Sequence, residues 1–363
     1  MPSQKANDRR RINLDKVIDF GKQLFAAVIR SRTGSLSELV RLLRFQPGTK
    51  CFHRQYEKLS VLFDDLEQVY RNVVLGFLSA KGLRLGIIDD SGLPKSGKTF
   101  PKQQIHHEHS NNTFYSGMKV LSTSVYQAGK LAIISSKIVG KTDNKLAVAE
   151  DDIEILVDDF LVDIILFDSW YCKRRVIEKI KEHNKIFISR LRTDSKVNLD
   201  DETTMRLDHI AKNLSHKQYE KIKINGKSYW ICDMTLDFET YGTLRVVFSK
   251  EGQHEKPIFL ATNAENFSAK FIVKLYMRRF NIEVFFKDAK QYLNLNTFFC
   301  RSQEKWDLHL RLTNVLHWGI QKKNSISKTV RAIRENMQDC LLFINQNALI
   351  NKFFDELRKR CQT

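Results

Sequence analysis

The run from Val162 to Phe167 constrains the fold more than any other segment of this chain. Five of its six residues are apolar, Asp163 being the exception, and Asp168 follows it directly. Such a run is typical of a β-strand that is buried on both faces, as in parallel sheets covered by helices. We therefore expect an α/β core in which this strand is central and an acidic side chain lies at its carboxyl end.

The segments around this strand support a mixed architecture. Apolar residues recur at three- and four-residue spacing over the first 80 residues, which predicts helices, and Gln46-Pro47-Gly48 breaks them. The next segments read as strands at Leu83–Ile88, Gly117–Tyr126 and Leu131–Val139, and as a helix at Leu146–Val157.

The pattern after Asp168 changes twice more. A helix at about 171–183 and a strand at Lys185–Leu191 precede a polar, strand-rich stretch from 195 to 262. Asn225-Gly226 within this stretch is a two-residue hairpin signal between Lys221–Ile224 and Lys227–Ile231. Helical periodicity returns from Ser268 to Leu293 and continues to the end of the chain.

These segments predict five parts along the chain. They are a helical N-terminal domain at 1–80, the first part of an α/β core at 81–194, a β-rich insertion at 195–262, the second part of the core at 263–325, and C-terminal helices at 326–363. The N-terminal domain is compact and basic, so it is either a reader of DNA ends or plain scaffolding.

The net charge of the chain indicates the class of partner that it binds. Sixty Lys and Arg residues face 42 Asp and Glu residues, which gives a formal charge of +18 and favours a polyanion such as nucleic acid. The six cysteines form no C-x-x-C pair and are expected to be reduced and mostly buried. No segment approaches about 18 uninterrupted apolar residues, so we expect no membrane partner and a location in the cytoplasm.

One helical segment carries a polar face beside an apolar one. At roughly 100° per residue, Tyr276, Arg279, Glu283 and Lys290 fall within one arc of about 60°. The carboxylate is suited to a hard cation and the two cations are suited to phosphate oxygens. The alternative is a salt-bridged amphipathic helix, because Arg279 and Glu283 are i, i+4 partners.

Acidic residues at strand ends favour the first interpretation. Asp89 and Asp90 follow the strand Leu83–Ile88, and Asp168 follows Phe167. Acids at the carboxyl ends of strands can converge on one point, although a turn former or helix cap is the commoner role. Two acids from strands and one from a helix are what phosphoryl transfer by two Mg²⁺ ions requires.

These motifs together resemble a known family. The spacing Tyr276-x2-Arg279-x3-Glu283-x6-Lys290 is similar to the Y-R-E-K signature of bacterial insertion-sequence transposases with a DDE active site. The segments from Ile88 to Lys95 and from Phe167 to Tyr171 resemble that family's first and second acidic motifs. The resemblance covers about residues 83 to 293.

The resemblance implies a fold and an activity. The fold would be an RNase H-like core interrupted by a β insertion, and the enzyme would depend on Mg²⁺ or Mn²⁺. It would cut at the element ends, join the freed 3′-OH to target DNA, and bind the terminal inverted repeats as a homodimer in the DNA complex.

The resemblance also assigns residues to roles. Asp89, Asp168 and Glu283 would hold the metal ions, and Tyr276, Arg279 and Lys290 would contact DNA phosphates. Asp90 remains an alternative to Asp89, which fits better the family pattern of an acid, a variable residue and then Ser or Thr. Trp170, Trp306 and Trp318 are available to stack on a flipped base, but no motif selects one.

A nucleotide-binding alternative arises from Gly92–Thr99. This segment matches the P-loop pattern G-x-x-x-x-G-K-T after a strand, and Val162–Asp168 imitates the partner strand. However, Pro101 lies where a P-loop helix needs a backbone N–H, and two adjacent acids precede the loop. We favour a basic loop that contacts DNA through Lys95, Lys98 and Lys102.

Two further alternatives remain. His106, His107 and His109 could bind a metal, but no second ligand group at zinc-site spacing accompanies them, and a polar loop is favoured. A DNA-binding protein without catalysis would keep the positive charge and lack the metal site.

Overall fold

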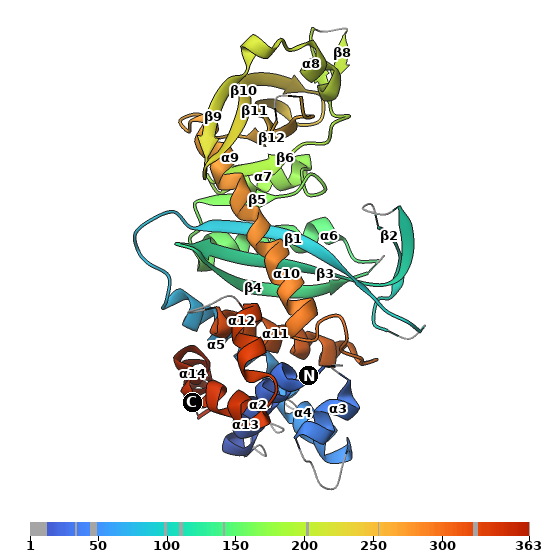
Figure 1. Cartoon of the computed structure of the whole chain (residues 1–363), viewed down its shortest axis with the longest axis vertical. Helices are drawn as coiled ribbons and strands as arrows, with labels where there is room; N and C mark the ends of the chain where they lie inside the picture. The colour runs from blue at the N-terminus through green and yellow to red at the C-terminus, as the bar shows by residue number, and fades with distance from the viewer. Residues whose placement is uncertain are drawn as a thin grey trace.

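The computed structural model describes residues 13–32, 35–43, 49–97, 100–108, 112–140, 142–200, 203–252, 254–321 and 326–362. The described chain combines an N-terminal helical region, a large mixed sheet and C-terminal helices, as the sequence predicts for an α/β protein. In Figure 1 these parts form an elongated molecule, with helices from both ends of the chain below the sheet.

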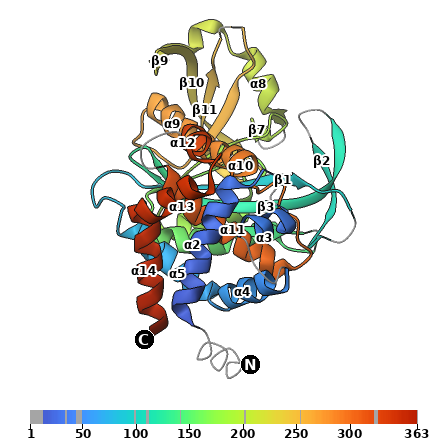
Figure 2. The ribbon, with the colours of Figure 1, turned by 60° about the horizontal axis from the view of Figure 1, so that its bottom comes forward.

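Helices from the two ends of the chain form one helical layer. The N-terminal ones are α2 (Leu14–Arg30), α3 (Leu36–Leu42), α4 (Thr49–Val61) and α5 (Phe63–Leu75). The C-terminal ones are α11 (Gln303–Ile320), α12 (Ile326–Ile333), α13 (Met337–Gln346) and α14 (Ala348–Gln362). Figure 2 shows α2 between α14 and α4, in agreement with its contacts. The predicted break at Gln46-Pro47-Gly48 lies outside the described residues.

The first half of the sheet contains both parallel and antiparallel strands. Its strands are β1 (Leu85–Pro94), β2 (Gln104–Glu108), β3 (Thr113–Gln127), β4 (Lys130–Val139), β5 (Ile164–Phe167) and β6 (Ile186–Arg190). β1, β5 and β6 run parallel, with β5 in the middle, while β3 pairs antiparallel with β1. The central position of β5 confirms what its apolar sequence predicts.

The second half of the sheet continues from β6. Its strands are β7 (Lys196–Asn198), β8 (Thr204–Arg206), β9 (Glu220–Ile224), β10 (Lys227–Phe238), β11 (Gly242–Lys250) and β12 (Ile258–Thr262). β12 pairs with β6, so the strand-rich stretch extends the same sheet, which has twelve strands within the described ranges. Asn225 and Gly226 have φ values of 50° and 82°, as the predicted hairpin between β9 and β10 requires.

Helices cover the two faces of the parallel strands. One face carries α6 (Lys145–Glu154), a π-helical turn (Ile155–Asp159) and α7 (Arg174–Glu182). The other carries α9 (Ala269–Tyr276), a 3₁₀ turn (Met277–Arg279) and α10 (Phe280–Tyr292), which crosses in front of β1 in Figure 1. Short helical segments at Leu207–Asn213 (α8) and His216–Gln218 lie within the strand-rich stretch.

Strand β1 is longer than the sequence predicts. It continues through Asp89, Asp90 and Gly92 to Pro94, because β3 supplies antiparallel partners beyond the last parallel pair, Ile88 with Phe167. The prediction that both acids follow the strand is therefore wrong. They lie inside it, where the parallel pairing ends.

The extended strand also excludes a P-loop. Gly92 belongs to β1 and pairs with Lys119, whereas a P-loop needs a phosphate-binding loop at this position. A Cβ on Gly92 would collide with the hydroxyl of Tyr115, which explains the glycine by packing. Residues Gln104–Glu108 form β2, so the helix that must follow a P-loop is replaced by a strand. The polar loop predicted around His106 and His107 is wrong for the same reason.

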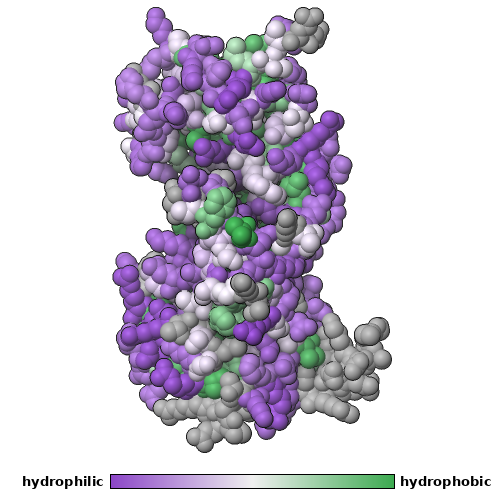
Figure 3. Space-filling model, turned by 90° about the vertical axis from the view of Figure 1, so that its right-hand side faces the viewer, coloured by the Kyte–Doolittle hydropathy of each residue, from purple (hydrophilic) through white to green (hydrophobic). Residues whose placement is uncertain are grey.

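The surface is mostly polar. On the face shown in Figure 3 hydrophilic residues predominate, and hydrophobic ones form small separate patches. None of the helices in the described ranges combines the length and apolar character needed to cross a membrane. Four cysteines are buried free thiols: Cys172, Cys232, Cys300 and Cys340.

Candidate active site

Three polar side chains lie next to one another where the parallel strands end. Ile88 of β1 pairs with Phe167 of β5, which in turn pairs with Ser189 of β6. The residues that follow these three are Asp89, Asp168 and Arg190. Because neighbouring strands are about 4.8 Å apart, the register places the two acids side by side and Arg190 next to Asp168.

Asp89, Asp168 and Arg190 lie on the same face of the sheet, because side chains alternate along the strands. Ile87, Leu166 and Ile188 belong to the apolar cluster that contains Ile282 and Phe286 of α10. Successive side chains point to opposite faces, so residues two positions further on, Asp89, Asp168 and Arg190, share that face. Helix α10 therefore lies over the edge where the two acids meet.

Asp90 lies on the opposite face and has other partners. Its carboxylate forms ion pairs with Lys145 and, at 3.4 Å, with Lys119, and it accepts a hydrogen bond of 2.7 Å from the hydroxyl of Tyr171. Burial disfavours the charged form, but Lys145 and Lys119 outweigh it and lower the pKa of Asp90. Its negative charge is thus neutralised within the fold.

Arg279 joins Asp89 to Glu283. Its Nη1 donates to Oδ2 of Asp89 at 2.6 Å, and its Nη2 donates to Glu283 one turn further along α10. The side chains of Arg279 and Asp89 are 17% and 13% exposed, whereas that of Glu283 is 41% exposed. The i, i+4 ion pair of an amphipathic helix is therefore present, but the same guanidinium also reaches an acid in the sheet.

The carboxyl group of Asp89 lies in a buried place that disfavours its negative charge. Burial raises the pKa of Asp89 to about 7 even though Arg279 acts against this shift, and the negative charges of Asp90 and Asp168 raise it further. Carboxylates that repel one another in a buried place require a compensating cation to be ionised together. A divalent cation bound at Asp89 would supply such a charge.

Asp168 is held by the turn that follows β5. Its Oδ1 accepts hydrogen bonds of 2.8 Å from the hydroxyl of Ser169 and from the backbone N–H of Trp170. Both contacts are local, so they fix the carboxylate at the strand end and leave Oδ2 for another partner.

Tyr276 and Lys290 extend the polar face of the helical segment in both directions. Burial raises the pKa of Tyr276 to about 12. The charges of Arg279, Asp168, Arg190 and Asp89 also act on this pKa, because the phenol lies near these four side chains. The ammonium of Lys290 donates to the hydroxyl of Ser91 on β1 at 2.8 Å. The structure thus brings Tyr276, Arg279, Glu283 and Lys290 to one edge of the sheet.

Of the three lysines expected in a DNA-binding loop, the structure describes Lys95 and Lys102, and Lys102 forms an ion pair with Asp143 at 2.8 Å. Lys95 is 9% exposed, and its ammonium donates to the backbone carbonyls of Asn296 and Phe298 at 2.5 and 3.1 Å and lies over the ring of Trp306. Burial lowers its pKa to about 8. The prediction of a solvent-facing Lys95 is wrong, while Lys98 lies outside the described residues.

The histidines and tryptophans separate by burial. His106 and His107 lie in β2, with His106 buried, and His109 lies outside the described residues.

Trp306 and Trp318 are 0% and 7% exposed, so neither offers a free ring face, whereas Trp170 is 45% exposed beside Asp168.

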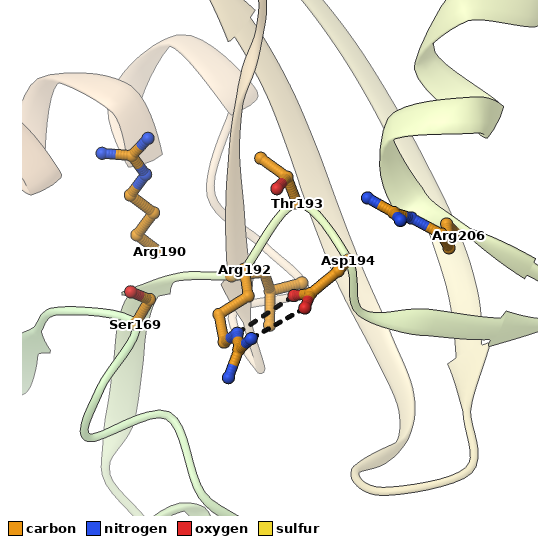
Figure 4. A pocket seen from close by; sticks show the side chains of 7 residues that line it. Ser169, Arg190, Arg192, Thr193, Asp194 and Arg206 are labelled. Carbon is orange, nitrogen blue, oxygen red and sulfur yellow. Dashed lines mark hydrogen bonds and ion pairs between the residues drawn. The ribbon is translucent and has the colours of Figure 1, made fainter.

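An arginine-lined pocket adjoins Asp168. Ser169, Arg190, Arg192 and Arg206 line it, and in Figure 4 Arg190 extends away from the hydrogen-bonded pair of Arg192 and Asp194. Arg192 and Arg206 form ion pairs with Asp194 and Asp208, but Arg190 has none with any residue that the structure describes. Arg190 was not predicted from the sequence, although a cation near the end of the predicted strand Lys185–Leu191 was a usable signal.

The donor set fits a hard divalent cation. The candidate ligands are carboxylate oxygens, which Mg²⁺ and Mn²⁺ prefer, and Asp89 is both buried and short of positive charge. In this conformation, the described residues contain no group of three or more His, Cys, Asp or Glu side chains arranged to hold a metal. Arg279 takes up the acidic oxygens of Asp89 and Glu283 instead.

Comparison with known families agrees with this geometry. A family model described as the transposase DDE domain matches residues 80–317, more than half of the 363-residue chain. The matched range begins just before β1 and ends within α11, so it contains Asp89, Asp168 and Glu283. No curated protein matches the chain.

Proposed function

The chain belongs to the family of transposases with a DDE domain, which makes it a DNA transposase, and we propose that its catalytic acids are Asp89, Asp168 and Glu283. The observation that carries this proposal is the shared guanidinium of Arg279, which binds Asp89 and Glu283 while Asp168 occupies the adjacent strand end. Asp89 is preferred to Asp90 because Asp90 lies on the other face with two lysines.

Divalent metal ions are typical of this family, and Mg²⁺, with Mn²⁺ as a substitute, is the cofactor that we propose for this chain. Asp89, Asp168 and Glu283 would hold it. A bound cation at such a site polarises phosphate oxygens and lowers the pKa of an attacking hydroxyl or water. The remaining task of the chain is to hold the scissile phosphate beside these acids.

Cationic and phenolic groups around the acids are suited to that task. Tyr276, Arg279 and Lys290 line one edge of the sheet, and we assign them to DNA phosphates because charged donors bind phosphate oxygens strongly. We also assign Arg190 to the phosphate contacts, because it lies next to Asp168 and forms no ion pair with a residue that the structure describes. Lys95 is removed from these contacts because its ammonium is buried.

The spacing from Tyr276 to Lys290 supports a narrower assignment. We propose that the enzyme belongs to the insertion-sequence transposases with the Y-R-E-K signature, which cut an element at its ends and join the freed 3′-OH to target DNA. Terminal inverted repeats in the DNA that flanks the gene would support this assignment, and flanks without such repeats would count against it.

We also propose roles for the parts of the chain outside the core. We assign recognition of element ends to residues 1–80, a supporting role to the insertion at 195–262, and pairing of the two ends to a homodimer formed in the DNA complex. Light scattering of the protein with and without a duplex that carries the inverted repeat would measure the dimer directly.

DNA cleavage by the wild-type chain and by Asp168→Asn tests the proposed function. With Mg²⁺ and duplexes carrying the element ends, the wild-type chain should nick DNA, and the variant should bind the duplex without cutting it, because a carboxylate has been lost and the phosphate contacts remain. Cleavage by the variant at the wild-type rate would refute the assignment. Binding without cleavage by both proteins would favour a non-catalytic DNA-binding protein.

A further inference from the structure

Arg279 occupies the place between two of the proposed metal ligands. One guanidinium donates to Asp89 with Nη1 and to Glu283 with Nη2. Metal ions need these same carboxylate oxygens, so Arg279 and the metal compete for them. A DNA phosphate offers the guanidinium an alternative partner with matching bidentate geometry.

The local backbone at Arg279 differs from the helices on either side. The helical run from Ala269 to Tyr292 is interrupted at one place by the 3₁₀ turn Met277–Arg279, and Arg279 is the last residue of that turn. A 3₁₀ stretch within a longer helix often marks a hinge. The side chain that joins the two acids is therefore attached where a small change in the helix would move it.

We propose that Arg279 is a gate that keeps the acidic site closed to metal until DNA is bound. This inference rests on the proposed function of Asp89, Asp168 and Glu283. In the absence of DNA, the guanidinium binds one oxygen of Asp89 and one of Glu283 and so competes with metal for both carboxylates. When a DNA phosphate binds the guanidinium, both carboxylates are released for metal, so the site is assembled only on its substrate.

Thermodynamic linkage gives the gate a measurable consequence. If DNA raises the affinity for metal by some factor, metal must raise the affinity for DNA by the same factor. Coupling between two sites usually amounts to roughly 5- to 150-fold. A structural ion pair without a gating role would give the same coupling in the wild-type chain and in Arg279→Gln, because only direct contact between metal and phosphate would then couple the two sites.

Binding of Mn²⁺ to the full chain, measured by electron paramagnetic resonance without DNA, tests the gate directly. Arg279→Gln should bind Mn²⁺ at least about fivefold more tightly than the wild-type chain, because the competing guanidinium has gone. Arg278→Gln is the matched control: it removes the same charge one residue away, where the guanidinium lies over the ring of Tyr126. Its Mn²⁺ affinity should stay near that of the wild type.

A second arm adds a short DNA duplex of arbitrary sequence at low salt, with the Mn²⁺ bound by DNA alone subtracted. The duplex should raise the Mn²⁺ affinity of the wild-type chain and of Arg278→Gln by a larger factor than that of Arg279→Gln, in which only direct contact between metal and phosphate couples the two sites. Arg279→Lys, which keeps the positive charge but lacks the planar, two-pronged guanidinium, should lie between them and serves if Arg279→Gln fails to fold. Equal Mn²⁺ affinity of the wild type and both Arg279 variants would overturn the gate.

Asp168→Asn in the wild-type and Arg279→Gln backgrounds separates failure of the gate from failure of the site. If Asp168→Asn weakens Mn²⁺ binding while Arg279→Gln leaves it unchanged, the gate is wrong and the acidic site stands. If Asp168→Asn changes Mn²⁺ binding in neither background, the proposed metal site is wrong, and the gate falls with it.

Discussion

Arg279 donates a 2.6 Å hydrogen bond to Asp89 across 190 residues of sequence. This contact joins the helical segment that carries Glu283 to the strand that carries the first acid, and it fixes which of two adjacent aspartates faces the helix. The proposed chemistry depends on that choice, because Asp90 points to the opposite face and is already neutralised by lysines.

Replacing Asp89 and Asp90 separately should produce opposite defects. Asp89→Asn should abolish cleavage while DNA binding remains, because it removes a proposed metal ligand. Asp90→Asn should instead lower the free energy of unfolding by about 3 kcal/mol, the usual effect of breaking a buried ion pair. Cleavage assays and chemical denaturation measure the two effects, and a stable, inactive Asp90→Asn enzyme would reverse the assignment.

The choice between these aspartates shows where sequence reasoning reaches its limit. The apolar run ending at Phe167 predicts β5 and Asp168, and the spacing from Tyr276 to Lys290 predicts one polar helical face; the structure has both. The face to which Asp89 points depends on where strand β1 pairs with β3 and β5, and those partners are distant in sequence. Periodicity within a single segment does not contain that information.

Lys95 illustrates the same limit from the opposite side. A lysine between Pro94 and Ser96 has the composition of an exposed turn, yet its ammonium is bound by carbonyls 201 and 203 residues away. The boundary of β1 was missed for a related reason. Gly92 and Pro94 resemble loop residues, but beyond Ile88 the strand needs partners only on the side of β3.

Lys95→Met should destabilise the protein without changing its affinity for DNA. The variant keeps an apolar stem of similar length but leaves two buried carbonyls without their donor, which costs about 1–3 kcal/mol. Thermal unfolding should therefore occur at a lower temperature. The salt dependence of DNA binding should match that of the wild type, and a shallower slope would restore Lys95 to the DNA-binding residues.

Lys290→Ala should weaken DNA binding and make it less dependent on salt. Loss of one phosphate contact lowers the slope of log affinity against log salt concentration by about 0.9. Lys179→Ala is a suitable control, because Lys179 lies on α7, over the other face of the sheet, and is paired with Glu154. Identical slopes for the wild type and Lys290→Ala would show that Lys290 does not contact phosphate.

Two buried histidines should make the fold sensitive to acid. Burial lowers the pKa of His309 and of His317 from 6.5 to about 3. Between pH 6.5 and about 3, the unfolded chain therefore binds more protons than the folded chain. The contribution of the neutral histidines to the free energy of unfolding is complete above the unfolded pKa and is lost as the pH falls. Each histidine contributes a slope of up to about 1.4 kcal/mol per pH unit.

Chemical denaturation at a series of pH values below neutrality measures this slope. His317→Gln should flatten it by the contribution of one histidine, whereas His216→Gln, at an exposed position, should leave it unchanged. An equally steep loss of stability in His317→Gln would mean that other groups cause the sensitivity to acid.

The central claim is that Asp89, Asp168 and Glu283 share divalent cations when DNA is bound. Anomalous scattering from Mn²⁺ in crystals of the protein with a duplex carrying the element end would locate the metal directly. We expect Mn²⁺ within about 2.5 Å of carboxylate oxygens from all three residues, taking metal–oxygen distances of the usual size, with Arg279 turned toward a phosphate. Manganese bound elsewhere, or a Glu283 carboxylate still held by Arg279 beside an occupied metal site, would contradict the account.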